Sequence, residues 1–177
     1  MPARKAPKRA ARARFTLTSP DFKPNGTIQM EQVFGGFGCT GKNISPALAW
    51  SGAPKDTKSF ALLAHDPDAP TGGAGWWHWL VVNIAPSVTA LAKDAGKSDG
   101  SNLPSGAVQV KTDFGSPGWG GPCPPVGDKP HRYVFTLYAL KTDGLDVSDA
   151  SPSLVGYMVN GNSIGKAKLT GRFGRKN

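Results

Sequence analysis

The stretch Arg132-Tyr-Val-Phe-Thr-Leu-Tyr-Ala-Leu140 is the longest strand signal in the chain. Within it, Tyr133, Phe135 and Leu137 are two residues apart and therefore share one face of an extended segment. Two short, continuous apolar runs precede it, Ser59–His65 and Trp79–Ile84. Runs of this kind are expected of central strands that are covered on both faces. These segments predict a sheet with a buried centre.

Weaker strand signals lie on either side of this centre. Alternating or β-like patterns occur at Phe15–Ser19, Thr27–Phe34, Gly106–Val110 and Ala167–Phe173. One helix is expected near residues 151–159, where Ser151 can serve as the N-cap and Pro152 as the first helical residue. Its apolar face would comprise Leu154, Val155, Met158 and Val159. We therefore predict a mainly β protein, a β-sandwich with one or two short helices.

Length and charge give the domain organisation. A chain of 177 residues fits one domain, and its 23 Gly and 16 Pro disfavour long helices. The net charge of +9 is concentrated at the start, because six of the 21 basic residues precede Phe15. We predict a disordered basic arm at 1–14 and a single domain at 15–177. A weak electrostatic tether to nucleic acid or anionic lipid is the alternative role for the arm.

The sequence also bears on localisation. No apolar run approaches the length of about 18 residues that a membrane span requires. The basic start lacks the apolar region of a secretory signal. As written the sequence predicts a cytoplasmic protein, and a periplasmic or secreted one if a signal has been removed. Cys39 and Cys123 are too far apart for a CxxC motif, which leaves two free thiols or one long-range disulfide.

Reactive side chains gather where apolar strands begin or end, at His65–Pro70, Gly75–His78, Gly120–Pro125 and Pro130–Tyr133. Loops of a sandwich cluster at its ends, so these segments are expected to converge on one rim. The imidazoles, the Tyr133 phenol and the backbone N–H groups of Gly120 and Gly121 can donate hydrogen bonds to an anion. A carboxylate can orient a histidine and keep its ring cationic. The expected chemistry is recognition of a small phosphate-like anion.

The chain resembles the phosphatidylethanolamine-binding protein family, also called the Raf kinase inhibitor proteins, in the order of four motifs. These are Asp66-Pro-Asp-Ala-Pro70, Trp76-Trp-His-Trp-Leu-Val-Val-Asn83, Gly121-Pro-Cys-Pro-Pro125 and His131-Arg-Tyr133. Asn43-Ile-Ser-Pro46 and Asp113-Phe-Gly115 further resemble its bacterial branch. The resemblance implies two antiparallel sheets and a cup that binds phosphate-bearing head groups.

Individual roles follow from this resemblance. It places Asp66, His78, His131 and Tyr133 in the polar cup, and Trp76 with the 121–125 loop, including Gly121, Cys123 and Pro124, in its wall. Asp68 belongs to the same motif and is counted among the ligand-binding residues, with holding the turn as the alternative role for its side chain. Trp77 and Trp79 are expected in the core, on the face opposite Trp76 and His78. The cup should be more open than in relatives that carry a C-terminal helix, because the sequence ends at Asn177.

The resemblance also bears on cysteines and function. It favours a disulfide between Cys39 and Cys123, which would suit an oxidising compartment. The function expected is non-catalytic binding of a small anionic or phosphorylated ligand, with no cofactor. Family analogy adds a kinase or protease partner, and a homodimer is one expected assembly. The alternative is a metal-dependent hydrolase that uses the His and Asp cluster, although no HExxH or GxSxG motif is present.

Overall fold

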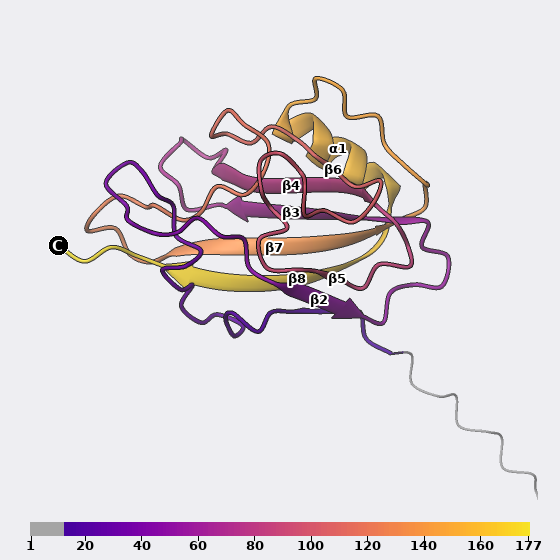
Figure 1. The fold of residues 1–177 in the computed structure, drawn as a ribbon, viewed down its shortest axis with the longest axis horizontal. Coiled ribbons are helices and arrows are strands. Elements are labelled where there is room, and N and C mark those ends of the chain that lie inside the picture. Colours follow the sequence, from indigo (N-terminus) through magenta and orange to yellow (C-terminus); the bar gives the residue numbers. More distant parts are fainter. Residues whose placement is uncertain (1–12) are drawn as a thin grey trace, which may run out of the picture.

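A five-stranded antiparallel sheet forms the centre of the computed structural model, which describes residues 13–177 (Figure 1). Its strand order is β6-β4-β3-β7-β8. The strands are β3 (Ser59–Asp66), β4 (Trp76–Ile84), β6 (Val108–Gln109), β7 (His131–Leu140) and β8 (Ser163–Phe173). A second antiparallel sheet, in the order β1-β2-β5, packs against one face. It consists of β1 (Thr16–Thr18), β2 (Leu48–Ser51) and β5 (Ala90–Leu91). The expected mainly β fold with two antiparallel sheets is confirmed.

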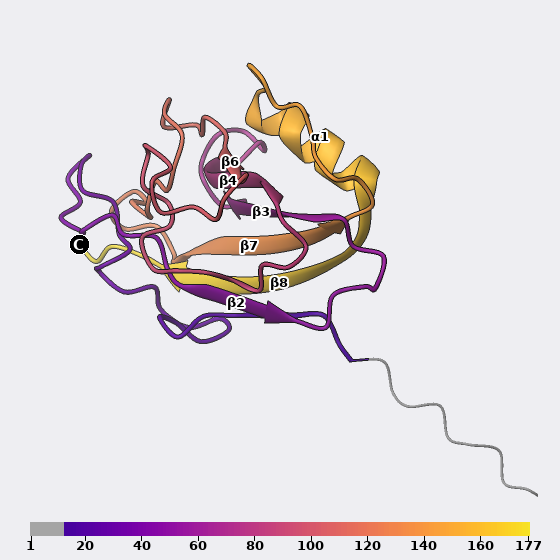
Figure 2. The same ribbon diagram turned by 45° about the vertical axis from the view of Figure 1, so that its right-hand side comes forward.

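Strand β3 explains why the centre of the large sheet is apolar on both faces. Phe60, Leu62 and Ala64 belong to the core cluster between the two sheets. Ala61 and Leu63 point the other way, into a second cluster beneath the helix. Because successive side chains of a strand alternate between faces, a strand covered on both sides must be apolar throughout. The helix α1 (Pro152–Asn162) supplies the second cover, as Figure 2 shows.

Helix α1 begins as its sequence predicts. The Ser151 side chain accepts a hydrogen bond from the backbone N–H of Leu154 at 3.2 Å, and Pro152 is the first helical residue. Val155 and Val159 are buried against the sheet, whereas Leu154 is 47% exposed and lies outside the contact. The 11 residues of α1 are too few to cross a lipid bilayer, and the described residues contain no membrane-spanning helix.

One expectation about secondary structure needs correction. The segment 27–34 is not a strand, because the N–H groups of Gln32 and Val33 donate to the carbonyl groups of Gln29 and Met30 and fold the chain into turns. Only Thr27 forms an isolated β-bridge, to Arg172. The two-residue strand β5 has too short a pattern to be recognised. The arm expected at 1–14 lies, apart from its last two residues, outside the described residues.

Candidate functional site

A β-bulge in β4 carries His78 toward the end of the sheet. Ala64 pairs with Trp79, and the next residue, His65, pairs with Trp77. His78 lies between these two partners on β4 and has no partner on β3, so it is the extra residue of the bulge. Bulges redirect side chains in this way and are frequent next to functional sites. The bulge also corrects the expectation that Trp77 and Trp79 share a face. Trp79 lies in the core between the sheets, whereas Trp77 packs on the helix side.

A cavity of about 370 Å³ opens where β3 ends and where β4 and β7 begin, at the end of the sheet near the C-terminus in Figure 1. We call it the cup. Most of the expected site residues line it: Asp66, Trp76, His78, Cys123, Pro124, His131 and Tyr133. A larger hollow of about 550 Å³ lies beside β6, and none of these residues lines it.

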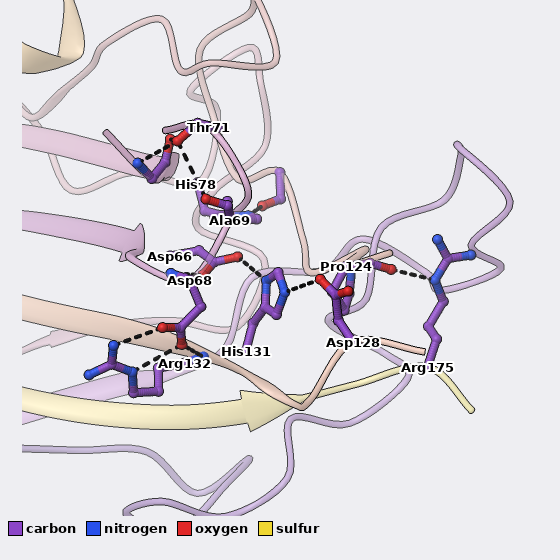
Figure 3. Close-up of polar contacts among 12 residues, drawn as sticks. Asp66, Asp68, Ala69, Thr71, His78, Pro124, Asp128, His131, Arg132 and Arg175 are labelled. Atoms are coloured by element: carbon purple, nitrogen blue, oxygen red, sulfur yellow. Dashed lines mark hydrogen bonds and ion pairs between the residues drawn. The ribbon is translucent and has the colours of Figure 1, made fainter. Parts of the chain in front are cut away.

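His131 is held between two carboxylates, as Figure 3 shows. Its Nδ1 lies 2.7 Å from Oδ2 of Asp66, and its Nε2 lies 2.9 Å from Oδ2 of Asp128. A carboxylate oxygen accepts hydrogen bonds, so both ring nitrogens donate and the ring is an imidazolium. Burial opposes this charge, but the hydrogen bonds to Asp66 and Asp128 outweigh it and raise the pKa of His131. Neither nitrogen remains free to donate to a ligand, contrary to the expectation from sequence.

His78 is in the opposite state. Its Nδ1 lies 2.5 Å from the carbonyl oxygen of Gly120, which can only accept, so Nδ1 carries the hydrogen. The side chain is buried, and this burial lowers the pKa of His78 to about 4 even though the hydrogen bond to Gly120 opposes the shift. The ring is therefore neutral near pH 7. Its Nε2 is an acceptor, whereas the sequence analysis expected a donor.

Tyr133 provides a hydroxyl group to the cup. Its side chain is 1% exposed, and its ring lies edge-on to that of His78 with centroids 5.1 Å apart. Its hydroxyl group has no hydrogen-bond partner among the described residues. Burial, followed by the charge of Asp66, raises the pKa of Tyr133. The phenol therefore stays protonated and can donate a hydrogen bond.

The Gly120–Gly121 loop does not offer its N–H groups to the cup. The N–H of Gly120 donates to the carbonyl group of His78 at 2.9 Å, and that of Gly121 donates to Oδ1 of Asn43 at 2.7 Å. The expectation that these groups bind an anion is therefore wrong. Both glycines are needed because the chain passes so close to its neighbours. A Cβ on Gly121 would lie 2.0 Å from the carbonyl oxygen of Gln32.

Asp68 lies outside the cup, where its carboxylate holds the turn to β7. Oδ1 accepts from Nη2 of Arg132 at 2.7 Å, and Oδ2 accepts from Nε and from the backbone N–H of the same residue (Figure 3). These hydrogen bonds lower the pKa of Asp68 to about 2. The structural role suggested for its side chain agrees with this geometry, and its assignment as a ligand-binding residue does not.

Four residues of the site were not identified from the sequence. Phe37 and Phe114 add apolar wall, Arg175 lies at the rim, and Asp128 binds His131. Arg175 donates from Nε to the carbonyl oxygen of Pro124 at 2.6 Å, and Figure 3 shows it on the far side of Pro124 from His131. Phe114 lies in the Asp113-Phe-Gly115 motif, which could have indicated it. The other three carry no local signal.

A disulfide closes the wall of the cup. Cys39 and Cys123 are bonded across a sequence separation of 84 residues. The bond joins the glycine-rich loop around Phe37 to the loop that contains Pro124. The two loops also share Arg175, since its Nη1 would lie 3.4 Å from a Cβ on Gly38. The disulfide therefore helps to fix one side of the cavity.

Together, the two sheets and the cup at their strand ends define a β-sandwich with a small polar receptacle at its rim. The sequence matches the phosphatidylethanolamine-binding protein family over residues 18–174. The chain belongs to this family.

Its relatives agree with this assignment. The chain is 55% identical to the YbcL protein of Escherichia coli K12 over 162 residues, which cover 91% of this chain and 88% of YbcL. It is 43% identical to the YbhB protein of the same organism, with 89% and 98% covered. The crystal structure of YbcL, described as a new member of the mammalian PEBP family, superposes with a TM-score of 0.89 at 54% identity and covers 92% of this chain and 99% of that one. The homologue CT736 of Chlamydia trachomatis gives a TM-score of 0.74 at 31% identity, with 93% and 99% covered.

Proposed function

We propose that this protein is a non-catalytic binding protein whose cup holds a small anion, such as the phosphate group of a head group or of a phosphorylated small molecule. The observation that carries the proposal is the unpaired hydroxyl of Tyr133, which faces a cavity beside the buried imidazolium of His131. A protonated hydroxyl and a nearby positive charge both favour an anionic oxygen. Modulation of a kinase or a protease would be a consequence of such binding.

The walls support the proposal. Trp76, Phe114, Pro124 and Pro125 surround the polar groups with stiff apolar surface, and the rings of Trp76 and Phe114 are packed edge-on at 5.5 Å. Apolar walls exclude water and strengthen the few polar contacts inside a cavity. A pocket with few polar groups and apolar walls is typical of a small-molecule site.

A hydrolytic metal site has no support. Each ring nitrogen of His131 is bound to a carboxylate, and Nδ1 of His78 is bound to a carbonyl oxygen. Within residues 13–177, no group of three or more His, Cys, Asp or Glu side chains is arranged to hold a metal ion.

The proposal is tested by titrating the protein with inorganic phosphate and following its tryptophan fluorescence and the NMR signals of the cup. We expect Tyr133→Phe to weaken binding about tenfold, because a hydrogen bond to a charged group is worth about 1.5 kcal/mol or more. Tyr157→Phe is the matched control, since Tyr157 lies 79% exposed on α1. Equal phosphate affinity of the parent protein and Tyr133→Phe, or no binding by the parent, would disprove the proposal.

A further inference from the structure

The outer edge of β8 is covered by another segment of the chain at one end of the strand. On one side β8 pairs with β7 along its whole length. On the other side, the N–H group of Asn25 donates to the carbonyl group of Thr170 at 2.7 Å. The N–H group of Arg172 donates to the carbonyl group of Gly26 at 2.8 Å. Thr170 and Arg172 therefore turn their backbone groups away from β7.

The same edge is open closer to the start of β8. Alternate residues of an antiparallel strand direct their backbone groups toward the partner strand and away from it. Lys168 and Lys166 lie two and four residues before Thr170, and their register with β7 is unbroken. Their N–H and C=O groups consequently point away from β7 as well. Among residues 13–177, none of these four groups has a hydrogen-bond partner. An open edge of this kind can pair with a further strand.

The side chains beside the open edge are positively charged. Lys166 and Lys168 are exposed on one face of β8, whereas Ala167 between them is buried in the core. Neither lysine forms an ion pair within the described part of the chain. Like charges that face each other across two strands are destabilising, so this edge disfavours a second copy of itself. Opposite charges are stabilising, so a strand with carboxylates at alternate positions is favoured.

A hollow of about 390 Å³ adjoins the beginning of the open edge. Phe15, Pro54 and Gly165 are among the residues that line it, and Lys55 and Lys166 add positive charge. The missing side chain of Gly165 would point at this hollow, because a Cβ there would lie 3.0 Å from Cγ of Pro54. The hollow thus lies on the face of β8 opposite the lysine side chains. A strand bound at the edge could direct apolar side chains into it.

The basic start of the sequence is joined to the same surface. Ala13 lines the hollow beside Phe15. Residues 1–12 contain five basic residues and no acidic residue, and they are connected to the domain at this point. Figure 1 shows the described N-terminal end at the end of the large sheet away from the C-terminus, and hence away from the cup. The surface is therefore separate from the cup, and its charge favours an anionic partner.

We propose that the open edge of β8 binds an acidic protein segment in an extended conformation, which adds a strand to the large sheet. Carboxylates of this segment would face Lys166 and Lys168, and its alternate apolar side chains would enter the hollow at Phe15 and Pro54. A peptide is favoured over a nucleic acid or a lipid surface, because a peptide strand presents N–H and C=O groups that match those of the edge. This interaction goes beyond the proposed function and does not depend on it.

The test uses a fluorescein-labelled peptide of seven residues in which glutamate and valine alternate. The control peptide has the same sequence and charge, but the backbone nitrogens of its glutamates are methylated and cannot donate. We expect the control to bind about tenfold more weakly by fluorescence anisotropy, the effect of about two lost backbone hydrogen bonds. The NMR amide signals of Lys166 and Lys168 should shift on binding. Equal affinity of the two peptides, or no binding of either, would overturn the inference.

Charge reversal at the edge provides a second readout. Lys166→Glu with Lys168→Glu should weaken binding of the acidic peptide about tenfold or more and should produce binding of a peptide that alternates lysine and valine. The matched control is Lys42→Glu with Lys111→Glu, which gives the same change in net charge at two exposed lysines elsewhere. If both double variants weaken binding equally, net charge is responsible and the site is wrongly placed. If the edge variant does not fold, the two peptides on the parent protein decide the question alone.

Other anionic partners are tested on the same proteins. A single-stranded oligonucleotide and vesicles containing phosphatidylserine have the charge of the peptide without its backbone. We expect deletion of residues 1–12 to weaken binding of all three, since long-range attraction is not specific to one polyanion. Only the acidic peptide should distinguish the edge variant from its matched control. If the oligonucleotide or the vesicles distinguish these two variants and the peptide does not, the edge serves a different class of partner and the inference is wrong.

Discussion

His131 donates a hydrogen bond from Nδ1 to Oδ2 of Asp66 at 2.7 Å, and both side chains are only 4% exposed. A buried ion pair of this kind is costly to break, because the remaining partner keeps its charge without compensation. Asp66 also accepts the backbone N–H of Asp68 at 2.8 Å, so the turn after β3 positions the carboxylate. The floor of the cup is thus a fixed charge pair.

We expect Asp66→Asn to lower the free energy of unfolding by about 3 kcal/mol at pH 6. The control is Asp68→Asn, which breaks a partly exposed pair with Arg132 and should cost about 1 kcal/mol or less. Urea unfolding measures both. If Asp66→Asn lowers the free energy of unfolding no more than Asp68→Asn does, Asp66 and His131 do not form a buried charge pair.

The pH dependence of the same variant follows from the raised pKa of His131. A histidine whose pKa is higher in the folded protein than in the unfolded chain stabilises the folded state. This contribution is fully present below the unfolded pKa of 6.5 and is lost as the pH rises through the folded pKa. The stability difference between the parent and Asp66→Asn should therefore shrink as the pH rises above 6.5. A difference that is constant from pH 5 to pH 9 would show that His131 is neutral.

His78 predicts a pH dependence of opposite sign. Its pKa is lowered to about 4 by burial, against 6.5 in an unfolded chain. Between these values the unfolded chain binds a proton that the folded protein does not, so stability falls as the pH drops from 6.5 to 4. At 1.36 kcal/mol per pH unit the full loss is about 3 kcal/mol. Between pH 6.5 and pH 4, the free energy of unfolding of the parent should fall by this amount relative to that of His78→Gln, whose side chain does not titrate. Parallel stability curves for the two proteins would contradict a neutral His78.

The sequence predicted the sheet centre well because β3, β4 and β7 leave strong patterns. Two-sided burial requires the uninterrupted apolar run 60–64 within β3, and β7 places Tyr133, Phe135 and Leu137 on one face. The cup followed from motif order at the ends of these strands. The segment 27–34 was wrongly predicted to be a strand because the same short pattern of eight residues is also compatible with consecutive turns.

The hydrogen-bonding roles of the cup residues were harder to predict than which residues line the cup. The choice between donor and acceptor at His78 depends on the carbonyl group of Gly120, 42 residues away, and on a bulge that no local pattern indicates. Asp128 binds His131 from three residues earlier, in a loop where an exposed aspartate is ordinary. Arg175 reaches the rim because β8 pairs with β7 along its whole length and brings the tail back to the cup.

The disulfide gives a prediction about stability and about the cup wall. In the chain-entropy model a loop closed over 84 residues contributes about 4 kcal/mol. Cys39→Ser with Cys123→Ser should lower the free energy of unfolding by this amount and weaken phosphate binding, because the loops around Phe37 and Pro124 lose their link. Mass spectrometry of the unreduced protein checks the bond directly. Two alkylatable thiols, or a stability loss below about 1 kcal/mol, would contradict it.

Gly121 lies where the cup wall passes very close to the loop behind it. A Cβ there would lie 2.0 Å from the carbonyl oxygen of Gln32 and 2.7 Å from the backbone nitrogen of Phe34. Both contacts are backbone atoms, so neither can rotate away. We expect Gly121→Ala to displace the wall, to break the hydrogen bond to Asn43, and to cost about 3 kcal/mol or prevent folding. The measurement is urea unfolding together with phosphate titration.

Gly156 is the matched control for Gly121, because the same added methyl group meets space in the middle of α1. Its Cβ would lie 4.0 Å from the ring of Trp77, which is ordinary van der Waals contact. Alanine favours a helix interior over glycine by about 1 kcal/mol, since glycine loses more backbone entropy on folding. Gly156→Ala should therefore raise the free energy of unfolding by about 0.5–1 kcal/mol and leave phosphate binding unchanged. If both glycine variants shift stability in the same direction, crowding at the cup wall is not what requires glycine at position 121.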